Sequence, residues 1–352
     1  MKSSLFIWLF TFCSFHFGLK LRSAPIVPSV NLSHYRAEDP MQGALRDISC
    51  FKEQGLTQFQ IDSEYDKWFF NDPNRISSVL PEEFMDINIM TFNIRYPNPD
   101  DGFNYWPNRK ELVASMIRYH DADILGIQEA FRSQLDELVA MLPDYAWVGV
   151  CRTSGDQNPN PDNEFSAILY KLERFDVLQN QTFWLSESPD IVGEAGWDAA
   201  LPRIVTWAQF RDRRTDKTFF HFNTHFDHRG KEARAKSAQL LLNKITDIAG
   251  PSPVLISGDF NAVPESTPYQ YLTAPQESER IYDALTLTES PHHGPLSTLT
   301  SGFKIAGVPG RRIDYIFIKN GVRILRHAIL SDSWGGRLPS DHLPVLATCR
   351  IP

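Results

Sequence analysis

Carboxylate and amide side chains follow two apolar runs of this sequence at points where they could hold a metal ion. Glu129 ends the run ILGIQ, and Asp259 and Asn261 come directly after VLISG. Hard divalent cations such as Mg²⁺ bind one or two carboxylates together with waters and substrate oxygens. Gly258 permits close backbone approach, and the i, i+2 spacing of Asp259 and Asn261 can direct both groups to one side. Taken alone, each motif is better explained as a hydrogen-bonded strand end or an Asx turn.

Histidines lie beside acids in two further segments. Residues 223–228 read NTHFDH and contain His225, and residues 339–344 read PSDHLP and contain Asp341 and His342. A histidine near an acid can donate to a developing phosphoryl charge or act as a base at neutral pH. Zinc fits less well, because no HExxH spacing occurs and no cysteine is close. These residues favour a hard-metal site with histidine donors.

A further acid, Asp314, interrupts the apolar segment RIDYIF. A buried carboxylate needs a partner, and His342 is a suitable one, since an acid that holds a histidine charged makes it a strong donor or base. A purely structural His–Asp contact would look the same in the sequence. Only the conjunction of all these motifs favours a catalytic site.

The elements that must position these residues alternate between short strands and a few helices. Period-two and continuous apolar patterns predict strands over 87–93, 123–128, 146–150, 165–170, 205–210, 218–223, 254–257, 312–318 and 345–349. Helical periodicity predicts helices over 108–120, 133–142 and 231–249. The polar residues lie at the ends of the predicted strands, where α/β proteins display their functional sites.

Composition indicates a globular protein that does not hold polyanions over a broad surface. The chain has 352 residues, of which 42% are hydrophobic, and 35 basic against 43 acidic side chains give a net charge of −8. A nucleic-acid scaffold needs many cationic phosphate contacts, so that class is disfavoured. The four cysteines form no CxxC pair and predict neither a disulfide framework nor a zinc knuckle.

The N-terminus differs from the rest of the chain. Residues 5–19 form one apolar run flanked by Lys2 and Lys20, which suits the core of a signal peptide and is short for a bilayer span. We therefore expect a signal peptide over 1–24, with a retained membrane anchor that contacts the bilayer as the alternative. Residues 25–85 are expected to form an extension whose aromatic side chains pack on the main domain.

Read in order, the motifs TFN, QE, THFDH, GDFN, RIDYIF and SDH resemble the endonuclease/exonuclease/phosphatase superfamily, the DNase-like metal-dependent phosphohydrolases. The resemblance covers residues 86–351. The segments FNIRY, FWLSE, WDAALPR and NTHFDH are similar to a compact, mostly bacterial branch whose substrates the resemblance does not define. It implies an α/β fold of four layers, in which two mixed β-sheets pack face to face and helices flank them.

The resemblance also implies roles for the site residues. The metal-binding positions would be Asn93, Glu129 and Asp341. The catalytic positions would be His225, Asp259, Asn261, Asp314 and His342. In this assignment Asn261 also binds the scissile phosphate, and Asp314 orients His342. The general base is either Asp259 or the Asp314–His342 pair, and the motifs leave that choice open.

Outside the shared motifs, Arg203 is the best candidate for a substrate clamp, since arginine binds phosphate in a bidentate manner. It could equally pair with a nearby acid. Weaker candidates for substrate contacts, for which a structural role is favoured, are Arg95, Trp106, Glu164 and Trp197.

These inferences predict a monomeric, secreted or periplasmic phosphohydrolase that uses Mg²⁺, with Mn²⁺ as the alternative metal, on a phosphoester substrate. Alternatives are an extracellular nuclease, a sphingomyelinase-like lipid phosphodiesterase and a non-catalytic binding module that retains the fold. The Trp-Cys-Asp-Arg box of inositol-polyphosphate 5-phosphatases is absent, with GRRID at residues 310–314 in its place, which disfavours that activity.

Overall fold

The computed structural model describes residues 84–274, 280–304 and 310–352. The expected signal peptide and all but the last two residues of the expected extension lie outside the described residues. The first strand begins at Met85, whose Cα lies opposite that of Ile351 near the C-terminus. None of the helices in the described ranges combines the length and the hydropathy needed to cross a bilayer.

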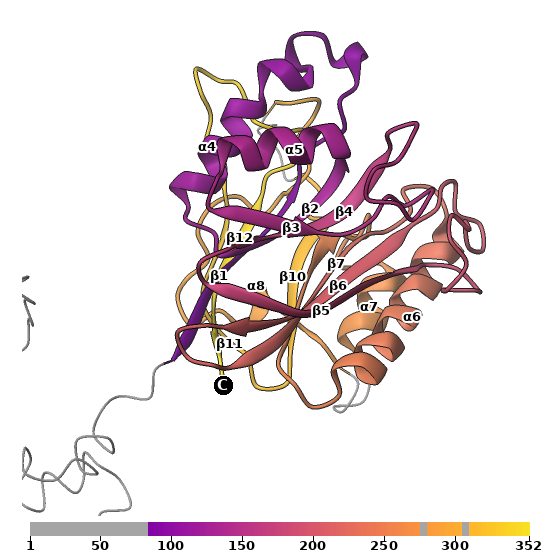
Figure 1. The fold of residues 1–352 in the computed structure, drawn as a ribbon, viewed down its shortest axis with the longest axis vertical. Coiled ribbons are helices and arrows are strands. Elements are labelled where there is room, and N and C mark those ends of the chain that lie inside the picture. The colour runs from indigo at the N-terminus through magenta and orange to yellow at the C-terminus, as the bar shows by residue number, and fades with distance from the viewer. Residues whose placement is uncertain (1–83, 275–279, 305–309) are drawn as a thin grey trace, which may run out of the picture. The chain divides into compact units, whose positions relative to one another are not determined.

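The strands of the described residues form two six-stranded mixed sheets (Figure 1). In spatial order the first sheet consists of β11 (Arg323–Ile329), β12 (Val345–Ile351), β1 (Met85–Asn93), β2 (Ile124–Phe131), β4 (Glu164–Lys171) and β3 (Tyr145–Val148). The second sheet consists of β5 (Phe175–Trp184), β6 (Ile204–Asp212), β7 (Thr218–His225), β8 (Val254–Asp259), β10 (Asp314–Lys319) and β9 (Tyr282–Asp283). The parallel pairs are β1 with β2 and β7 with β8.

Helices cover the outer faces of both sheets and complete four layers. Helices α4 (Lys110–Tyr119) and α5 (Arg132–Met141) lie on the first sheet, and α6 (Lys231–Ala249) and α7 (Thr267–Thr273) lie on the second (Figure 1). The 3₁₀ turns η1 (Pro99–Asn104) and η2 (Trp106–Asn108) precede α4, and α8 (Ala284–Leu287) follows β9. The structure confirms the predicted α/β sandwich of two mixed sheets flanked by helices.

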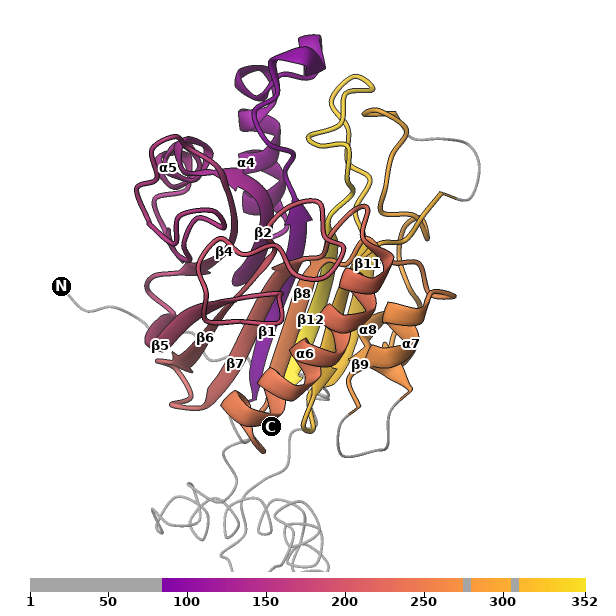
Figure 2. The ribbon, with the colours of Figure 1, turned by 90° about the vertical axis from the view of Figure 1, so that its right-hand side faces the viewer.

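Three hydrophobic clusters hold these layers together. The central cluster lies between the sheets and includes Phe175, Phe210 and Phe219. A second joins the first sheet to α4 and α5, and a third joins the second sheet to α6 and α7. Figure 2 shows the loops that follow β1 and precede β12 rising from the same end of the sandwich. The layers thus form a rigid support for residues at that end.

The sequence-based prediction missed the strands β5, β9 and β11. All three are edge strands that pair on one side only. The middle of β5 is exposed, and a bulge interrupts the pairing of β11 with β12 after Ile324. An edge strand buries less apolar surface than a central one, so its sequence resembles a loop.

Several predicted boundaries were also wrong. The strand predicted over 312–318 begins at Asp314, because the backbone N–H groups of Ile313 and Asp314 donate to Thr298 Oγ1 (3.0 and 3.1 Å). The helix predicted over 108–120 begins at Lys110, after the separate turn η2. The strand predicted over 146–150 ends at Val148, where Gly149 takes a φ of 142°. The helix predicted over 231–249 is confirmed at both ends.

Candidate active site

Strand register brings three predicted site residues into one row across the second sheet. The Cα atoms of His225 and Asp259 are partners in the parallel pair β7–β8, and those of Asp259 and Asp314 are partners in β8–β10. In the first sheet, Asn93 ends β1 beside Gln128 of β2. Because β1, β2, β7 and β8 are parallel within their pairs, their carboxyl ends collect these polar groups at one end of the sandwich.

A bulge in β2 places Glu129. The register of β2 with β4 shifts between Ile127 and Ala130, and Glu129 takes a positive φ of 62°. A left-handed conformation in a residue other than glycine is costly and persists only where its surroundings enforce it. Here the Glu129 carboxylate accepts hydrogen bonds from Asn93 Nδ2 (3.1 Å) and from the backbone N–H of Tyr96 (3.2 Å).

Asp259 makes polar contacts with residues of both sheets. Its Oδ2 accepts from Asn93 Nδ2 (3.1 Å) and lies 3.4 Å from His225 Nε2 and 3.8 Å from His342 Nε2. Its Oδ1 accepts from the backbone N–H of Asn261 (2.9 Å). Asp259 is 1% exposed, so all of these contacts operate away from bulk water.

Asn261 and His225 form a second hydrogen-bonded unit. Asn261 has a φ of 47°, which asparagine tolerates better than most residues, and its side-chain amide donates to His225 Nε2 and to the carbonyl of Phe226, both at 3.0 Å. Burial lowers the pKa of His225 well below its usual value, and the positive charges of Arg203 and Arg152 lower it further. His225 is therefore neutral at pH 7.

The pKa of His342 is shifted in the opposite direction from that of His225. The Nδ1 atom of His342 is 2.9 Å from Asp314 Oδ2, and both residues are buried. Burial alone would lower the pKa of His342, but the Asp314 carboxylate outweighs it and raises this pKa well above its usual value. For Asp259, burial and the nearby Asp314 raise the pKa. A charged histidine thus faces a carboxyl group that can take up a proton near neutral pH.

Two sets of residues in the described part of the chain could be considered for a metal ion. Asp259, Asp314 and His342 each offer a ligand atom, with all three within 4.8 Å of one another. However, the short contact between Asp314 and His342 and the raised pKa of His342 favour an acid–base unit there. Glu129 and Asp341 form the set that we favour, because the charge of Glu129 acts on Asp341 and both residues are linked to Asn93, directly for Glu129 and through Ser340 for Asp341.

The environment of Asp341 fits a cation. Burial raises the pKa of Asp341, and the charge of Glu129 adds to the shift, against the effect of His342. Two neighbouring carboxylates with this electrostatic conflict are stabilised by a positive ion between them. The Asn93 side-chain oxygen accepts from the backbone N–H of Arg95 (3.0 Å) and keeps a second lone pair. This set of oxygen donors is of the kind that Mg²⁺ prefers.

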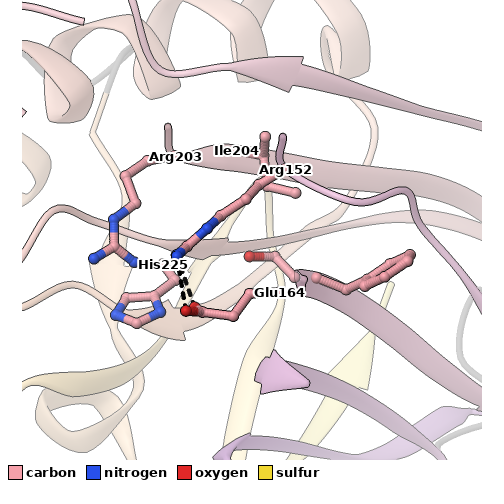
Figure 3. A pocket seen from close by; sticks show the side chains of 7 residues that line it. Arg152, Glu164, Arg203, Ile204 and His225 are labelled. Atoms are coloured by element: carbon pink, nitrogen blue, oxygen red, sulfur yellow. Dashed lines mark hydrogen bonds and ion pairs between the residues drawn. The ribbon is translucent and has the colours of Figure 1, made fainter. Parts of the chain in front are cut away.

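Arg203 lies beside His225 in a small pocket (Figure 3). Its Nε is 3.4 Å from Asp227 Oδ2 and its Nη2 is 3.0 Å from His228 Nδ1, whereas its buried Nη1 has no hydrogen-bond partner among the described residues. The structure thus shows Arg203 paired with an acid, and its role as a substrate clamp stays a prediction.

The same pocket contains Arg152 and Glu164. Arg152 donates two hydrogen bonds of 2.7 Å to the Glu164 carboxylate, which lies next to the His225 ring in Figure 3. Burial raises the pKa of Glu164, and Arg152 opposes that shift. A structural role was favoured for Glu164 from the sequence, and its ion pair with Arg152 fits that role.

The other weak candidates are held by structural contacts. Trp106 is 4% exposed and donates to Glu137 Oε2 (2.6 Å). The backbone N–H of Trp197 donates to the Glu187 carboxylate (3.0 Å). Arg95 pairs with Asp101 at 3.0 Å and lies 4.0 Å from Asp341 Oδ2.

Sequence reasoning missed Arg109, which ties together the two loops that carry the metal-binding candidates. This guanidinium is 1% exposed and donates to the carbonyls of Ile94, Arg95 (2.7 Å) and Pro339 (3.1 Å). Ser340 adds a further link, since its hydroxyl donates to the Asn93 carbonyl (2.7 Å). Nothing in the sequence around Arg109 distinguishes it from a surface arginine at a helix start.

Comparisons with known proteins agree with this geometry. The model of the "Endonuclease/Exonuclease/phosphatase family" matches residues 90–342. A solved endonuclease/exonuclease/phosphatase from Bacteroides vulgatus is 38% identical with a TM-score of 0.72, and the match covers 76% of this chain and 100% of that one. A mannosyl-6-phosphatase from Bacteroides thetaiotaomicron is 32% identical with a TM-score of 0.69 over 75% of this chain and 99% of that one.

Curated relatives are more distant. Protein angel of Drosophila melanogaster is 26% identical over 186 residues, which is 48% of this chain and 48% of that protein. Nocturnin of the same organism is 25% identical over 213 residues, or 55% of this chain and 31% of that protein. The chain thus spans about half or less of the length of these two relatives.

Proposed function

Because the chain belongs to the endonuclease/exonuclease/phosphatase family, we propose that it is a divalent-metal-dependent hydrolase that cleaves a phosphoester by in-line attack of water. The observation that carries the proposal is the contact between the sheets: Asn93 of the first sheet donates to both Glu129 and Asp259. This bond joins the proposed metal-binding group to the acid–base group in one site.

Asn93, Glu129 and Asp341 would hold Mg²⁺, with Mn²⁺ as the alternative. The cation would supply positive charge to the non-bridging oxygens of the scissile phosphate, where negative charge develops in phosphoryl transfer. Since the chain carries a net charge of −8, a bound cation would add positive charge at the place where an anionic substrate binds.

Asp259 is the better candidate for the general base. His342 is held in its protonated form by Asp314 and cannot take a proton from water at neutral pH, whereas the raised pKa of Asp259 suits that step. In this scheme Asp259 orients water and accepts its proton. His342, through Nε2, and His225, through Nδ1, would donate hydrogen bonds to the phosphoryl oxygens as their charge increases. Asn261 already donates both amide protons, to His225 Nε2 and to the Phe226 carbonyl, so it would orient His225 and reach the phosphate only by exchanging one of these bonds.

A small phosphorylated sugar is the substrate class we propose. The similarity to the mannosyl-6-phosphatase extends over 99% of that chain, and the buried free donor of Arg203 could bind one phosphate oxygen. The leader expected from the sequence fits a secreted or periplasmic enzyme. The net charge of −8 fits small substrates better than long nucleic acids. Determination of the N-terminal residue of the exported protein would distinguish a cleaved leader from a retained anchor.

The test is a substrate panel with and without metal. Sugar phosphates, nucleotides, DNA, RNA and sphingomyelin are incubated with the protein in Mg²⁺, in Mn²⁺ and in excess EDTA. We expect hydrolysis of sugar phosphates, its loss in EDTA and its recovery on addition of Mg²⁺. Undiminished hydrolysis in EDTA would overturn the metal mechanism. Preferred cleavage of DNA, RNA or sphingomyelin would assign a nuclease or a lipid phosphodiesterase, and no hydrolysis at all would favour a binding module.

A further inference from the structure

A second cleft, with a volume of about 480 Å³, lies on the outer face of the first sheet. Its floor includes a row of opposed side chains from three neighbouring strands: Arg326 of β11, Thr348 of β12 and Asn88 of β1. Asn88 precedes Asn93 by five residues on the same strand, which corresponds to about 17 Å at the usual rise of a strand. The cleft is therefore separate from the candidate active site.

The cleft is already formed by hydrogen bonds of the fold. Thr348 Oγ1 donates to Asn88 Oδ1 (2.9 Å), and Asn88 Nδ2 donates to the Asp121 carbonyl just after α4 (3.3 Å). On the other side, the backbone of Ser290 and His293 is hydrogen-bonded to β11 at 3.2 and 3.1 Å. Both walls are thus fixed to the same sheet, so a ligand would not have to order them.

Charge in the cleft favours an anion. The exposed guanidinium of Arg326 makes no hydrogen bond or ion pair with any residue that the structure describes. Asp332 next to the cleft is already paired with His120 (3.1 Å), and the flanking acids Asp86 and Glu289 are each paired with an arginine. Arg326 therefore carries an uncompensated positive charge at the floor, and its planar fork suits a phosphate or carboxylate group.

An aromatic ring at the rim favours a ring-shaped ligand. Tyr119 at the end of α4 is 81% exposed, and it packs against His120 at an angle of 88° between the rings. This edge-to-face contact covers at most one face of the tyrosine ring, so the other face is available to a flat or ring-shaped group. A volume of about 480 Å³ is within the range of small-molecule sites.

We propose that this cleft binds a sugar that carries a phosphate or a carboxylate, with the anionic group on Arg326 and the sugar ring against Tyr119. It would be a second site for an anionic sugar, separate from the place of hydrolysis. The proposal does not depend on the identity of the hydrolysed substrate.

Calorimetric titration of the full-length protein in EDTA tests this binding. The probes are glucuronate, glucose 6-phosphate and neutral glucose, and the variants are Arg326→Gln and Tyr119→Ala. The matched control is Arg323→Gln, an exposed arginine of the same strand that pairs with Glu289. We expect a Kd for at least one anionic sugar that rises about tenfold or more in Arg326→Gln and stays unchanged in the control, and we expect weaker binding of neutral glucose.

Tyr119→Ala should weaken binding of the anionic sugars but leave binding of inorganic phosphate or acetate unchanged. Since the Arg326 side chain has no partner among the described residues, Arg326→Gln should keep the thermal midpoint and the hydrolytic rate of the unaltered protein. The proposal fails if no anionic sugar binds, if Arg326→Gln binds as tightly as the unaltered chain, or if Arg323→Gln weakens binding to the same extent. Binding of one anion alone would identify which group the cleft recognises.

Discussion

At the scale of single residues, two raised pKa values divide the acid and base roles within one buried cluster. Asp259 and His342 lie 3.8 Å apart, yet burial and Asp314 raise the pKa of the first, and Asp314 keeps the second protonated. Two titratable groups whose pKa values are shifted by their surroundings can serve as base and acid at the same pH. The roles proposed for these residues rest on that division.

Asp259→Asn should lower kcat by about 100-fold or more, since the amide can neither accept the proton of water nor carry the charge that His225 and His342 face. Steady-state hydrolysis of the best substrate of the panel measures the effect. Asp247→Asn, an exposed substitution on α6, is the control and should leave kcat unchanged. A kcat for Asp259→Asn within a few-fold of the unaltered enzyme would refute the assignment.

Arg203→Gln should raise the KM for a phosphorylated substrate about tenfold, because the free Nη1 donor is lost. Arg211→Gln, on strand β6 that begins directly after Arg203, has its side chain 45% exposed and should not alter the KM. Arg203→Lys keeps the charge but not the planar guanidinium group, so its KM should lie between the values for Arg203→Gln and Arg211→Gln. If Arg203→Gln lowers the thermal midpoint but leaves the KM unchanged, Arg203 serves Asp227 rather than the substrate.

At the scale of elements, a buried polar network sets how closely the two sheets approach. Gln128 Nε2 donates to Asn223 Oδ1 across the interface (2.7 Å), and Ser257 Oγ donates to the same oxygen (3.2 Å). His221 Nε2 continues the network to Ser257 at 2.8 Å. Because the catalytic residues come from both sheets, this spacing determines whether Asn93 reaches Asp259.

Gly126→Ala should destabilise the protein by about 2–3 kcal/mol, because a Cβ at Gly126 would overlap the side chains of Ser257 and Asn223. Urea unfolding measures the change. Gly335→Ala is the control: a Cβ at Gly335 meets nothing within 4 Å, so the positive φ of 61° alone should cost about 1 kcal/mol. Equal losses in both variants would show that close approach of the sheets at Gly126 contributes no additional energy.

His221 should make the protein sensitive to acid. Burial lowers the pKa of His221 to about 3, while unfolding would return it to about 6.5. As pH falls from 6.5 towards 3, the unfolded chain binds this proton and the folded chain does not, so the free energy of unfolding falls by about 1.4 kcal/mol per unit. Above pH 6.5 this contribution is complete.

His221→Leu removes that titrating group. The slope of the free energy of unfolding against pH should therefore decrease by about one proton. Urea unfolding between pH 5 and pH 8 measures the slope. His327, whose pKa burial and His292 also lower to about 3, and His225, whose pKa is lowered by burial, remain in the variant and should maintain the rest of the slope. An unchanged slope in His221→Leu would show that His221 is not the source.

At the scale of the whole molecule, the described residues from 84 onward contain every proposed catalytic and metal-binding group, from Asn93 to His342. The first strand is complete in that range, since Met85 opposes Ile351 at the C-terminal strand. The two sheets and the loops at their ends therefore contain the whole of the proposed site.

Removal of residues 1–83 should leave kcat and KM for a soluble phosphoester within about twofold of the full chain. The physical reason is that both sheets and all proposed site residues remain. Parallel assays of the two proteins, with circular dichroism to check folding, measure this. A folded but inactive truncated chain would show that the N-terminal segment contributes to the site.

The sequence by itself determined the family, the sandwich fold and the candidates at the ends of central strands. Apolar runs such as VLISGD mark buried strands, and the polar residues that end them are conspicuous there. It did not reveal the edge strands β5 and β11, which pair with a neighbouring strand on one side only, or Arg109, whose role depends on carbonyls far apart in the chain. The tertiary structure also decided the protonation of His342 and Asp259, because a pKa in a buried cluster depends on distances between β8, β10 and the loop before β12, which local sequence does not fix.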